Sequence, residues 1–474
     1  MLHIKDHLVG RRICLTILAA ALFLSFIQPL AADDKPPNIL LIMADDLGAE
    51  NLPCYGNTMY ATPHLDQMAA EGALFENAYA SPVCTPTRAM ILTGLYPNRT
   101  GFLERLDSPD DVEKSNRLPV HLKTFGHLFQ DAGYATAIAG KWHLGDFQRF
   151  PDQPTSHGFD EHCLWVQYWD GVRPSRYYGP HVWENGEYIV YEREVFGPDH
   201  YTDFLIDFMR RSHEREQPFL AYFPMNLIHT PFVTPPGDQA AAEMHYPADL
   251  GRAERLNGRM VHYMDQLVGR LLKTLEDLGI DDNTLVIFTG DNGTVGNLVN
   301  QLGDFHLRGG KRTMNEAGTR VPFIAWWPGR IPAGNRESMM SLMDMLPTLA
   351  AVAGIPVEHE VDGLDLSHNL FDQPGKDRAF FAMAFEGGCY FVRDKHFRLH
   401  EDGRFYHIPN NHNETRYGMT VVANPGEYLE SRERLQFLLE DFMAIQKTDI
   451  TYHVVPFGTG GDRYKNAQDR DRGK

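Results

Sequence analysis

Five short apolar segments constrain the fold more than any other feature of this sequence. Each runs for four to seven residues and then stops at polar residues or glycine. Segments that stay apolar over this length are typical of strands covered on both faces, as in a mostly parallel sheet. The segments are residues 38–44, 136–139, 218–223, 284–289 and 321–327.

Helical patterns lie between or after these segments, at residues 204–213, 255–278 and 337–353. Strands that alternate with helices predict a large, doubly wound α/β sheet. A chain of 474 residues also has room for a second, smaller unit.

The pattern changes after about residue 355. Shorter apolar segments occupy residues 379–384, 389–393 and 396–400, with turn-like sequences at 386–388 and 401–403. They predict a smaller α+β subdomain built on an antiparallel sheet. We therefore expect a main domain over residues 33–354, a C-terminal subdomain over 355–457 and a flexible polar tail over 458–474.

The first 32 residues are laid out like a secretory signal peptide. Lys5, Arg11 and Arg12 precede an apolar run at 13–27, and small residues ending at Ala32 follow. The run is shorter than the roughly 20 residues that span a bilayer, so we expect cleavage and no permanent membrane anchor. A secreted or periplasmic protein is predicted, and the arginine pair leaves twin-arginine export open.

The net charge and the cysteine content bear on the possible binding partners and disulfides of the protein. The formal net charge of −19 makes nucleic acid an unfavourable partner. Without the leader the cysteines are Cys54, Cys84, Cys163 and Cys389. Four cysteines in an exported protein permit one or two disulfides, which competes with a special role for Cys84.

Two acidic pairs directly follow predicted strands. Asp45 and Asp46 come after the first strand, and Asp291 and Asn292 come after the strand that ends near Gly290. Carboxyl ends of strands are where open α/β sheets hold ligands, and four oxygen-bearing side chains there suit Ca²⁺. The alternatives are ordinary turns and glycosylation of the sequon that begins at Asn292, which would exclude Asn292 as a ligand.

Further motifs lie in order along the chain. Cys84-Thr85-Pro86-Thr87-Arg88 continues into Ala89-Met90-Ile91-Leu92-Thr93-Gly94. Next come Gly140-Lys141-Trp142-His143-Leu144-Gly145, His229-Thr230-Pro231 and Gly309-Gly310-Lys311 ahead of Glu316. Together with the acidic pairs, they resemble the signature of the type I sulfatases, formylglycine-dependent enzymes of the alkaline phosphatase superfamily.

The resemblance implies a site, cofactors and a maturation partner. A formylglycine-generating enzyme would convert Cys84 to formylglycine (3-oxoalanine), and Ca²⁺ would be held by Asp45, Asp46, Asp291, Asn292 and the modified Cys84. One hydroxyl of the hydrated aldehyde would attack sulfur, held ionised by Ca²⁺ and Arg88. Of the remaining residues, Lys141 adds positive charge, His143 is the base on the second hydroxyl, and His229 or Lys311 protonates the leaving alcohol.

Two departures from the family pattern concern substrate contacts. Glu316-Ala317-Gly318 stands where the family has Glu-Gly-Gly. A serine that some arylsulfatases place near the sulfate has no counterpart in the segment containing Cys163, Trp165, Gln167 and Tyr168. The aromatic residues from Trp165 to Trp183 are typical either of a platform for sugar rings or of a loop packed on the sheet.

The predicted function is hydrolysis of the sulfate ester of a sulfated carbohydrate. One alternative keeps the site but hydrolyses phosphonate monoesters or phosphodiesters. Another is a sulfated-glycan binding protein whose Cys84 is never modified. Which sugar is bound, which sulfate is removed, endo or exo action and the oligomeric state do not follow from the sequence.

Overall fold

The computed structural model describes residues 35–103, 106, 117–237, 251–385, 389–408 and 420–448. The predicted signal peptide and polar tail lie outside these residues. All the elements described below belong to one compact unit, Pro37–Lys474. Among the described residues, no helix combines the length and the apolar character needed to cross a bilayer.

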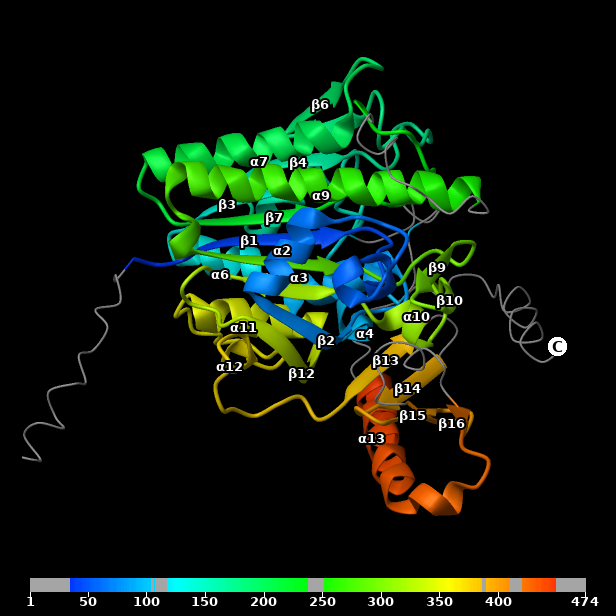
Figure 1. Ribbon diagram of the computed structural model, residues 1–474. Helices are drawn as coiled ribbons and strands as arrows, with labels where there is room; N and C mark the ends of the chain where they lie inside the picture. Colours follow the sequence, from blue (N-terminus) through cyan, green and yellow to red (C-terminus); the bar gives the residue numbers. More distant parts are fainter. Residues whose placement is uncertain are drawn as a thin grey trace, which may run out of the picture. The chain divides into compact units, whose positions relative to one another are not determined.

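A ten-stranded sheet forms the centre of the molecule (Figure 1). Strands β8, β1, β7, β3 and β4 are parallel neighbours, while β11 and β5 run against the strands beside them. This confirms the large, mostly parallel sheet. The strands are, in spatial order, β12 (Gly334–Ser341), β2 (Ala73–Tyr79), β11 (Phe323–Trp326), β8 (Thr284–Gly290), β1 (Asn38–Ala44), β7 (Phe219–Pro224), β3 (Ala135–Gly140), β4 (Glu161–Trp165), β5 (His181–Glu184) and β6 (Glu187–Val190).

Alternate side chains of β1 enter two different cores. Leu41 packs in the cluster that includes Phe125 and Leu346, whereas Leu40 packs in the cluster that includes Leu205 and Met260. Strands buried on both faces explain the uninterrupted apolar segments in the sequence. The helices on the first face are α3 (Cys84–Thr93), α6 (Phe125–Asp131) and α11 (Met345–Val352), and those on the second are α2 (Pro63–Glu71), α7 (Gly197–Glu214) and α9 (Arg252–Leu278) (Figure 1).

A separate antiparallel sheet confirms the change of pattern near the C-terminus. Its apolar face packs on Leu435, Leu439 and Phe442 of the long helix α13. The division of the chain at residue 354 remains a prediction. The elements are β13 (Phe381–Phe385), β14 (Cys389–Arg393), β15 (Phe397–His400), β16 (Phe405–His407), β17 (Thr420–Val421) and α13 (Leu429–Thr448).

The remaining elements are short connections between these layers. They are β9 (Val299–Leu302), β10 (Phe305–Arg308), α4 (Pro97–Thr100), α10 (Glu316–Thr319), α12 (Ser367–Leu370) and the 3-10 turns η2 (Ala49–Asn51), η3 (Pro53–Tyr55), η4 (Thr155–His157), η5 (Asp281–Asn283), η6 (Leu342–Asp344) and η8 (Pro425–Tyr428).

The helix expected over residues 337–353 was wrong in its first half. That half forms β12, which pairs in parallel with β2, and the helix α11 begins only at Met345. The reason is a capping box at Ser341 and Asp344, which starts a new helical turn after the strand. The partner strand β2 was missed, because the buried Glu76 and Asn77 interrupt its apolar pattern.

The end of β3 has no room for a side chain. Gly140 has φ 115°, and a Cβ atom there would lie 2.2 Å from the carbonyl oxygen of Pro224. That carbonyl also accepts a hydrogen bond from the backbone N–H of Lys141, at 2.7 Å. Close approach of β3 and β7 therefore fixes the backbone from which Lys141 projects.

We predict that Gly140→Ala lowers the free energy of unfolding by about 3 kcal/mol or more, since strain and a backbone clash add together. The matched control is Gly133→Ala, where φ is 87° but no atom lies within 4 Å of the added Cβ. Gly133→Ala should lower the free energy of unfolding by the cost of backbone strain alone, about 1 kcal/mol. Denaturant unfolding curves measure both, and equal losses would show that the contact with β7 is unimportant.

Candidate active site

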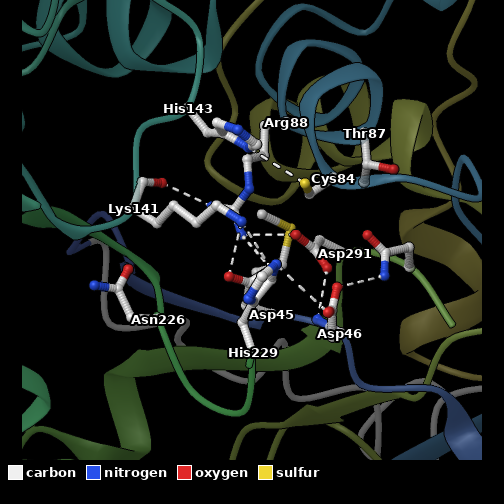
Figure 2. Close-up of polar contacts among 12 residues, drawn as sticks. Asp45, Asp46, Cys84, Thr87, Arg88, Lys141, His143, Asn226, His229 and Asp291 are labelled. Carbon is white, nitrogen blue, oxygen red and sulfur yellow. Dashed lines mark hydrogen bonds and ion pairs between the residues drawn. The ribbon is translucent and has the colours of Figure 1, made fainter. Parts of the chain in front are cut away.

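Neighbouring strand ends bring most of the predicted site residues together. Asp45 and Asp46 follow β1, Asp291 follows β8 and Lys141 follows β3. His229 comes shortly after β7, and Cys84 is the first residue of α3 (Figure 2). These strands are adjacent and parallel, so their carboxyl ends meet at one edge of the sheet.

Arg88 connects three of these segments from inside the protein. Its Nη2 atom donates to Asp291 Oδ2 at 2.7 Å and lies 3.7 Å from Asp45 Oδ1. Its Nη1 atom donates to the carbonyl oxygen of Lys141 at 2.7 Å. The guanidinium is 1% exposed, so its charge acts in a medium of low dielectric constant.

Two lysines each bind one carboxylate of the acidic pair, and Figure 2 shows the first of them, Lys141. Lys141 Nζ donates to both carboxylate oxygens of Asp45, at 2.9 and 2.8 Å. Lys311 Nζ donates to Asp46 Oδ1, and His229 Nε2 lies 3.6 Å from Asp46 Oδ2. Three separate motifs of the sequence thus meet at adjacent aspartates.

The oxygen atoms at this edge fit a hard divalent cation. Ligand atoms of Asp45, Cys84 and Asp291 lie within 4.8 Å of one another, as do those of Asp45, Asp46 and His229. Asn292 Nδ2 donates to Asp46 Oδ1 at 2.9 Å, while its Oδ1 atom is buried without a partner. An unpartnered amide oxygen beside buried carboxylates is a donor set suited to a cation such as Ca²⁺. Burial of Asn292 also removes it as a glycosylation site.

Cys84 is paired with His143, not with another cysteine. The Cys84 Sγ atom lies 3.2 Å from His143 Nδ1, and His143 Nε2 lies 2.7 Å from the carbonyl oxygen of Leu106. Because a carbonyl only accepts, Nε2 carries the proton and Nδ1 is an acceptor aimed at Cys84. Among the described residues, no disulfide joins any two of Cys54, Cys84, Cys163 and Cys389, so the disulfide alternative is not realised there.

Comparison with known proteins agrees with this arrangement. The protein-family model described as Sulfatase matches residues 37–355. N-acetylgalactosamine-6-sulfatase of Canis lupus familiaris is 34% identical over 405 residues, which cover 78% of this chain and 72% of that protein. The chain belongs to the sulfatase family. It is therefore a sulfuric ester hydrolase with the α/β fold of that family.

Two further relatives extend the comparison of this sulfatase. Arylsulfatase A of Homo sapiens is 33% identical over 401 residues, covering 77% of this chain and 75% of that protein. A crystal structure of Ps i-CgsB in complex with k-i-k-neocarrahexaose matches with a TM-score of 0.75 and 25% identity. That match covers 91% of this chain and 97% of the other.

Electrostatics in the sulfatase site separate the three aspartates. Burial alone would raise the pKa of Asp45, but the charge of Lys141 and its cationic neighbours holds that pKa well below its usual value. Burial likewise opposes ionisation of Asp46, and His229 and Lys311 lower its pKa. Burial and the nearby Asp45 raise the pKa of Asp291 to about 6. Such crowding of negative charge is the condition that a bound cation relieves.

Cys84, the predicted nucleophile position, and its partner His143 are both held neutral. Burial raises the pKa of the Cys84 thiol, and burial together with Lys141 and Arg88 keeps the pKa of His143 well below its usual value. The Cys84–His143 contact is therefore a neutral hydrogen bond and not a thiolate–imidazolium pair. A neutral His143 is available to accept a proton.

Residues in both segments that depart from the family pattern make buried polar contacts. Glu316 begins α10, and its Oε1 atom accepts hydrogen bonds from Arg393 at 2.5 Å and Arg398 at 2.7 Å. Gln167 lies next to His143, where its Nε2 atom donates to the carbonyl oxygen of Leu106. Gln167 and His143 thus share the Leu106 carbonyl in one hydrogen-bond network.

Arg176 is a site residue that the sequence did not indicate. It lies about 130 residues after Asp45, in the aromatic segment, and its Nη1 atom is 3.4 Å from Asp45 Oδ2. Its guanidinium also stacks on the Trp165 ring, 4.5 Å from the ring centroid. The segment thus packs on the sheet and supplies a charge, and Trp169 stacks on Tyr188 beside it.

We predict that Arg176→Met lowers kcat/KM for an aryl sulfate by tenfold or more, about 1.4 kcal/mol, because a buried positive charge leaves Asp45. Arg173→Met is the matched control, since Arg173 stacks on the same Trp165 ring at 5.6 Å. Melting temperatures report whether each variant folds. Equal kinetic losses in the two variants would mean that stacking, and not charge at Asp45, is what matters.

Proposed function

We propose that this sulfatase removes sulfate from a sulfated carbohydrate, with formylglycine made from Cys84 as its nucleophile and Ca²⁺ as its metal. The observation that carries the proposal is the meeting of Cys84, the acidic pair, Asp291 and Arg88 in one buried space. The relatives that act on sulfated sugars by name, such as N-acetylgalactosamine-6-sulfatase, support the substrate class.

The cation would be held by Asp45, Asp46, Asp291, Asn292 and the modified side chain of Cys84. Their oxygen donors suit Ca²⁺ better than a softer metal. When present, the cation and the hydrated aldehyde would supply positive charge and a hydroxyl nucleophile for transfer of the sulfuryl group. In the sulfatase family as a whole, formylglycine and a metal generally serve this chemistry.

The basic residues would stabilise charge on the sulfuryl oxygens. Arg88, Lys141 and Lys311 are almost fully buried and fixed by ion pairs, so they need little reorganisation as the reaction proceeds. One preorganised group of this kind contributes about 3 kcal/mol to lowering the barrier. Several such groups are needed, because enzymes must remove roughly 8 to 23 kcal/mol from uncatalysed barriers.

His143 would act as the base that accepts a proton from the side chain at position 84. Its Nδ1 atom lies 3.2 Å from Cys84 Sγ, within proton-transfer distance of an oxygen attached to the same Cβ. The Leu106 carbonyl fixes its tautomer. Its low pKa keeps it neutral at ordinary pH, as a base must be.

The proton for the leaving alcohol would come from Lys311. Burial lowers the pKa of His229 to about 3, despite the opposing effect of Asp46, so His229 is neutral above that pH. Burial also disfavours the charge of Lys311, but Asp46 outweighs it and raises the pKa of the ammonium group. Of the two candidate acids, Lys311 is the one that holds a proton in the free enzyme.

The substrate would be a short or terminal sulfated saccharide. A net charge of −19 repels extended polyanions at long range, so binding relies on the local basic site. A small cleft beside His143 is lined by Trp165, Gln167 and Tyr168. We further propose export from the cell, to the periplasm or the exterior, and maturation by a formylglycine-generating enzyme.

The direct test is release of free sulfate from a panel of defined sulfated saccharides by matured enzyme. We expect turnover that is lost on chelation, restored by Ca²⁺ and absent in Cys84→Ala. Mass spectrometry of the peptide that contains residue 84 should show formylglycine in protein from the native host. An intact thiol there, or faster turnover of matched phosphodiesters or phosphonates, would refute the proposal.

A leaving-group series tests the proton donor. We predict that Lys311→Met loses more activity on alkyl or sugar sulfates than on 4-nitrophenyl sulfate, whose leaving group needs no proton. The difference should reach about a hundredfold, as is usual for a general acid. His229→Gln is the comparison, with losses that are similar for all the esters. A uniform loss in Lys311→Met would assign that residue to binding alone.

A further inference from the structure

A second cluster of metal-ligating side chains lies away from the catalytic residues. Cys163 in β4 and Glu184 in β5 face each other as paired residues of neighbouring antiparallel strands. His200, in the first turn of α7, completes the group. Ligand atoms of these three residues all lie within 4.8 Å of one another. β4 lies three strands away from β1, the strand that precedes Asp45. Neighbouring strands are about 4.8 Å apart, so the cluster lies about 14 Å from β1.

The separations within the cluster fit a small tetrahedral ion. Cys163 Sγ lies 3.5 Å from Glu184 Oε2, and His200 Nε2 lies 2.9 Å from the same oxygen. Bond lengths of about 2.3 Å for sulfur and about 2.0 Å for nitrogen or oxygen place tetrahedral zinc ligands roughly 3.3 to 3.6 Å apart. The thiol and the carboxylate already have this spacing, and His200 Nε2, at 2.9 Å from the carboxylate oxygen, would move away from that oxygen to reach it.

The donor set favours Zn²⁺ over the cation proposed for the catalytic centre. Thiolate and imidazole are ligands for zinc, whereas Ca²⁺ takes oxygen. Cys163 is fully buried, but the Glu184 and His200 side chains are each 23% exposed, which leaves a route from solvent. The Tyr191 hydroxyl, 3.4 Å from Glu184 Oε2, lies at the same place.

We propose that Cys163, Glu184 and His200 form a zinc site, with water or Tyr191 as the fourth ligand. On binding, the Cys163 thiol loses its proton to solvent and a sulfur–zinc bond forms, while imidazole binds as the neutral tautomer with its proton on Nδ1, so that His200 Nε2 gives up the proton it donates to Glu184; no oxidation state changes. The ion takes the place of the hydrogen bonds that Cys163 and His200 share with Glu184. It would tie the β4–β5 pair to α7 and protect a free thiol from oxidation.

Cys54 provides a matched control for this site. Its backbone N–H donates to Asp66 Oδ1 at 3.0 Å, and the same carboxylate interacts with its thiol. It is therefore a second thiol beside a carboxylate, partly buried where Cys163 is fully buried. Cys54 is in none of the groups of ligand atoms found among the described residues.

The experiment is titration of the full-length protein with Zn²⁺ and with Co²⁺, at saturating Ca²⁺ and in a Cys84→Ser background that removes the catalytic thiol. We expect one zinc per chain. Co²⁺ should give a near-ultraviolet thiolate-to-metal band, which is lost in Cys163→Ser and retained in Cys54→Ser. His200→Gln should weaken binding roughly tenfold or more.

The melting temperature provides a second measurement. Zn²⁺ should raise it in the parent protein and in Cys54→Ser, because a ligand that binds the folded state stabilises it. Zn²⁺ should not raise it in His200→Gln, a change at a partly exposed position that avoids disturbing the buried Cys163. Absence of zinc binding at micromolar concentration, or a cobalt band that survives both Cys163→Ser and His200→Gln, would overturn the proposal. Neither result bears on the sulfatase reaction, since no step of it uses these residues.

Discussion

The structure depends on one electrostatic constraint, the burial of three aspartates in a single space. Asp45, Asp46 and Asp291 are at most 3% exposed, where like charges repel strongly and water cannot screen them. The protein balances them with cationic side chains from four other segments, namely Arg88, Lys141, Arg176 and Lys311. Removing one of these partners takes a cationic neighbour from a buried carboxylate, so the site and the fold around it are energetically linked.

This constraint explains how far the sequence alone could lead. The acidic pairs follow apolar strands, and parallel strands in one sheet end at one edge, so the meeting of Asp45 and Asp291 followed from local pattern and topology. The motifs around Cys84, Lys141 and Lys311 were recognisable only through their resemblance to the type I sulfatase signature, and not from local pattern. The large sheet was predictable because its strands are covered on both faces.

Other features were not predictable, and for physical reasons. Arg176 reaches Asp45 from a loop with irregular backbone. Such a loop has no repeating pattern, so its sequence does not predict which side chains point inward. β2 was missed because the buried side chains of Glu76 and Asn77 find polar partners on β12: Glu76 Oε1 accepts a hydrogen bond from Asn335 Nδ2, and Asn77 Nδ2 donates to the backbone carbonyl of Glu337. The sequence of a single strand does not show which distant residues its polar side chains will contact.

The ion pairs of Glu316 carry a consequence for the architecture. Glu316 follows Lys311 by five residues in the catalytic part of the chain, whereas Arg393 and Arg398 belong to β14 and β15 of the small antiparallel sheet. All three side chains are at most 1% exposed, so neither α10 nor the small antiparallel sheet can bury its share of this charge without the other. The C-terminal sheet is thus structural support for the segment that carries Lys311, and not an appendage that selection can exchange or discard independently of catalysis.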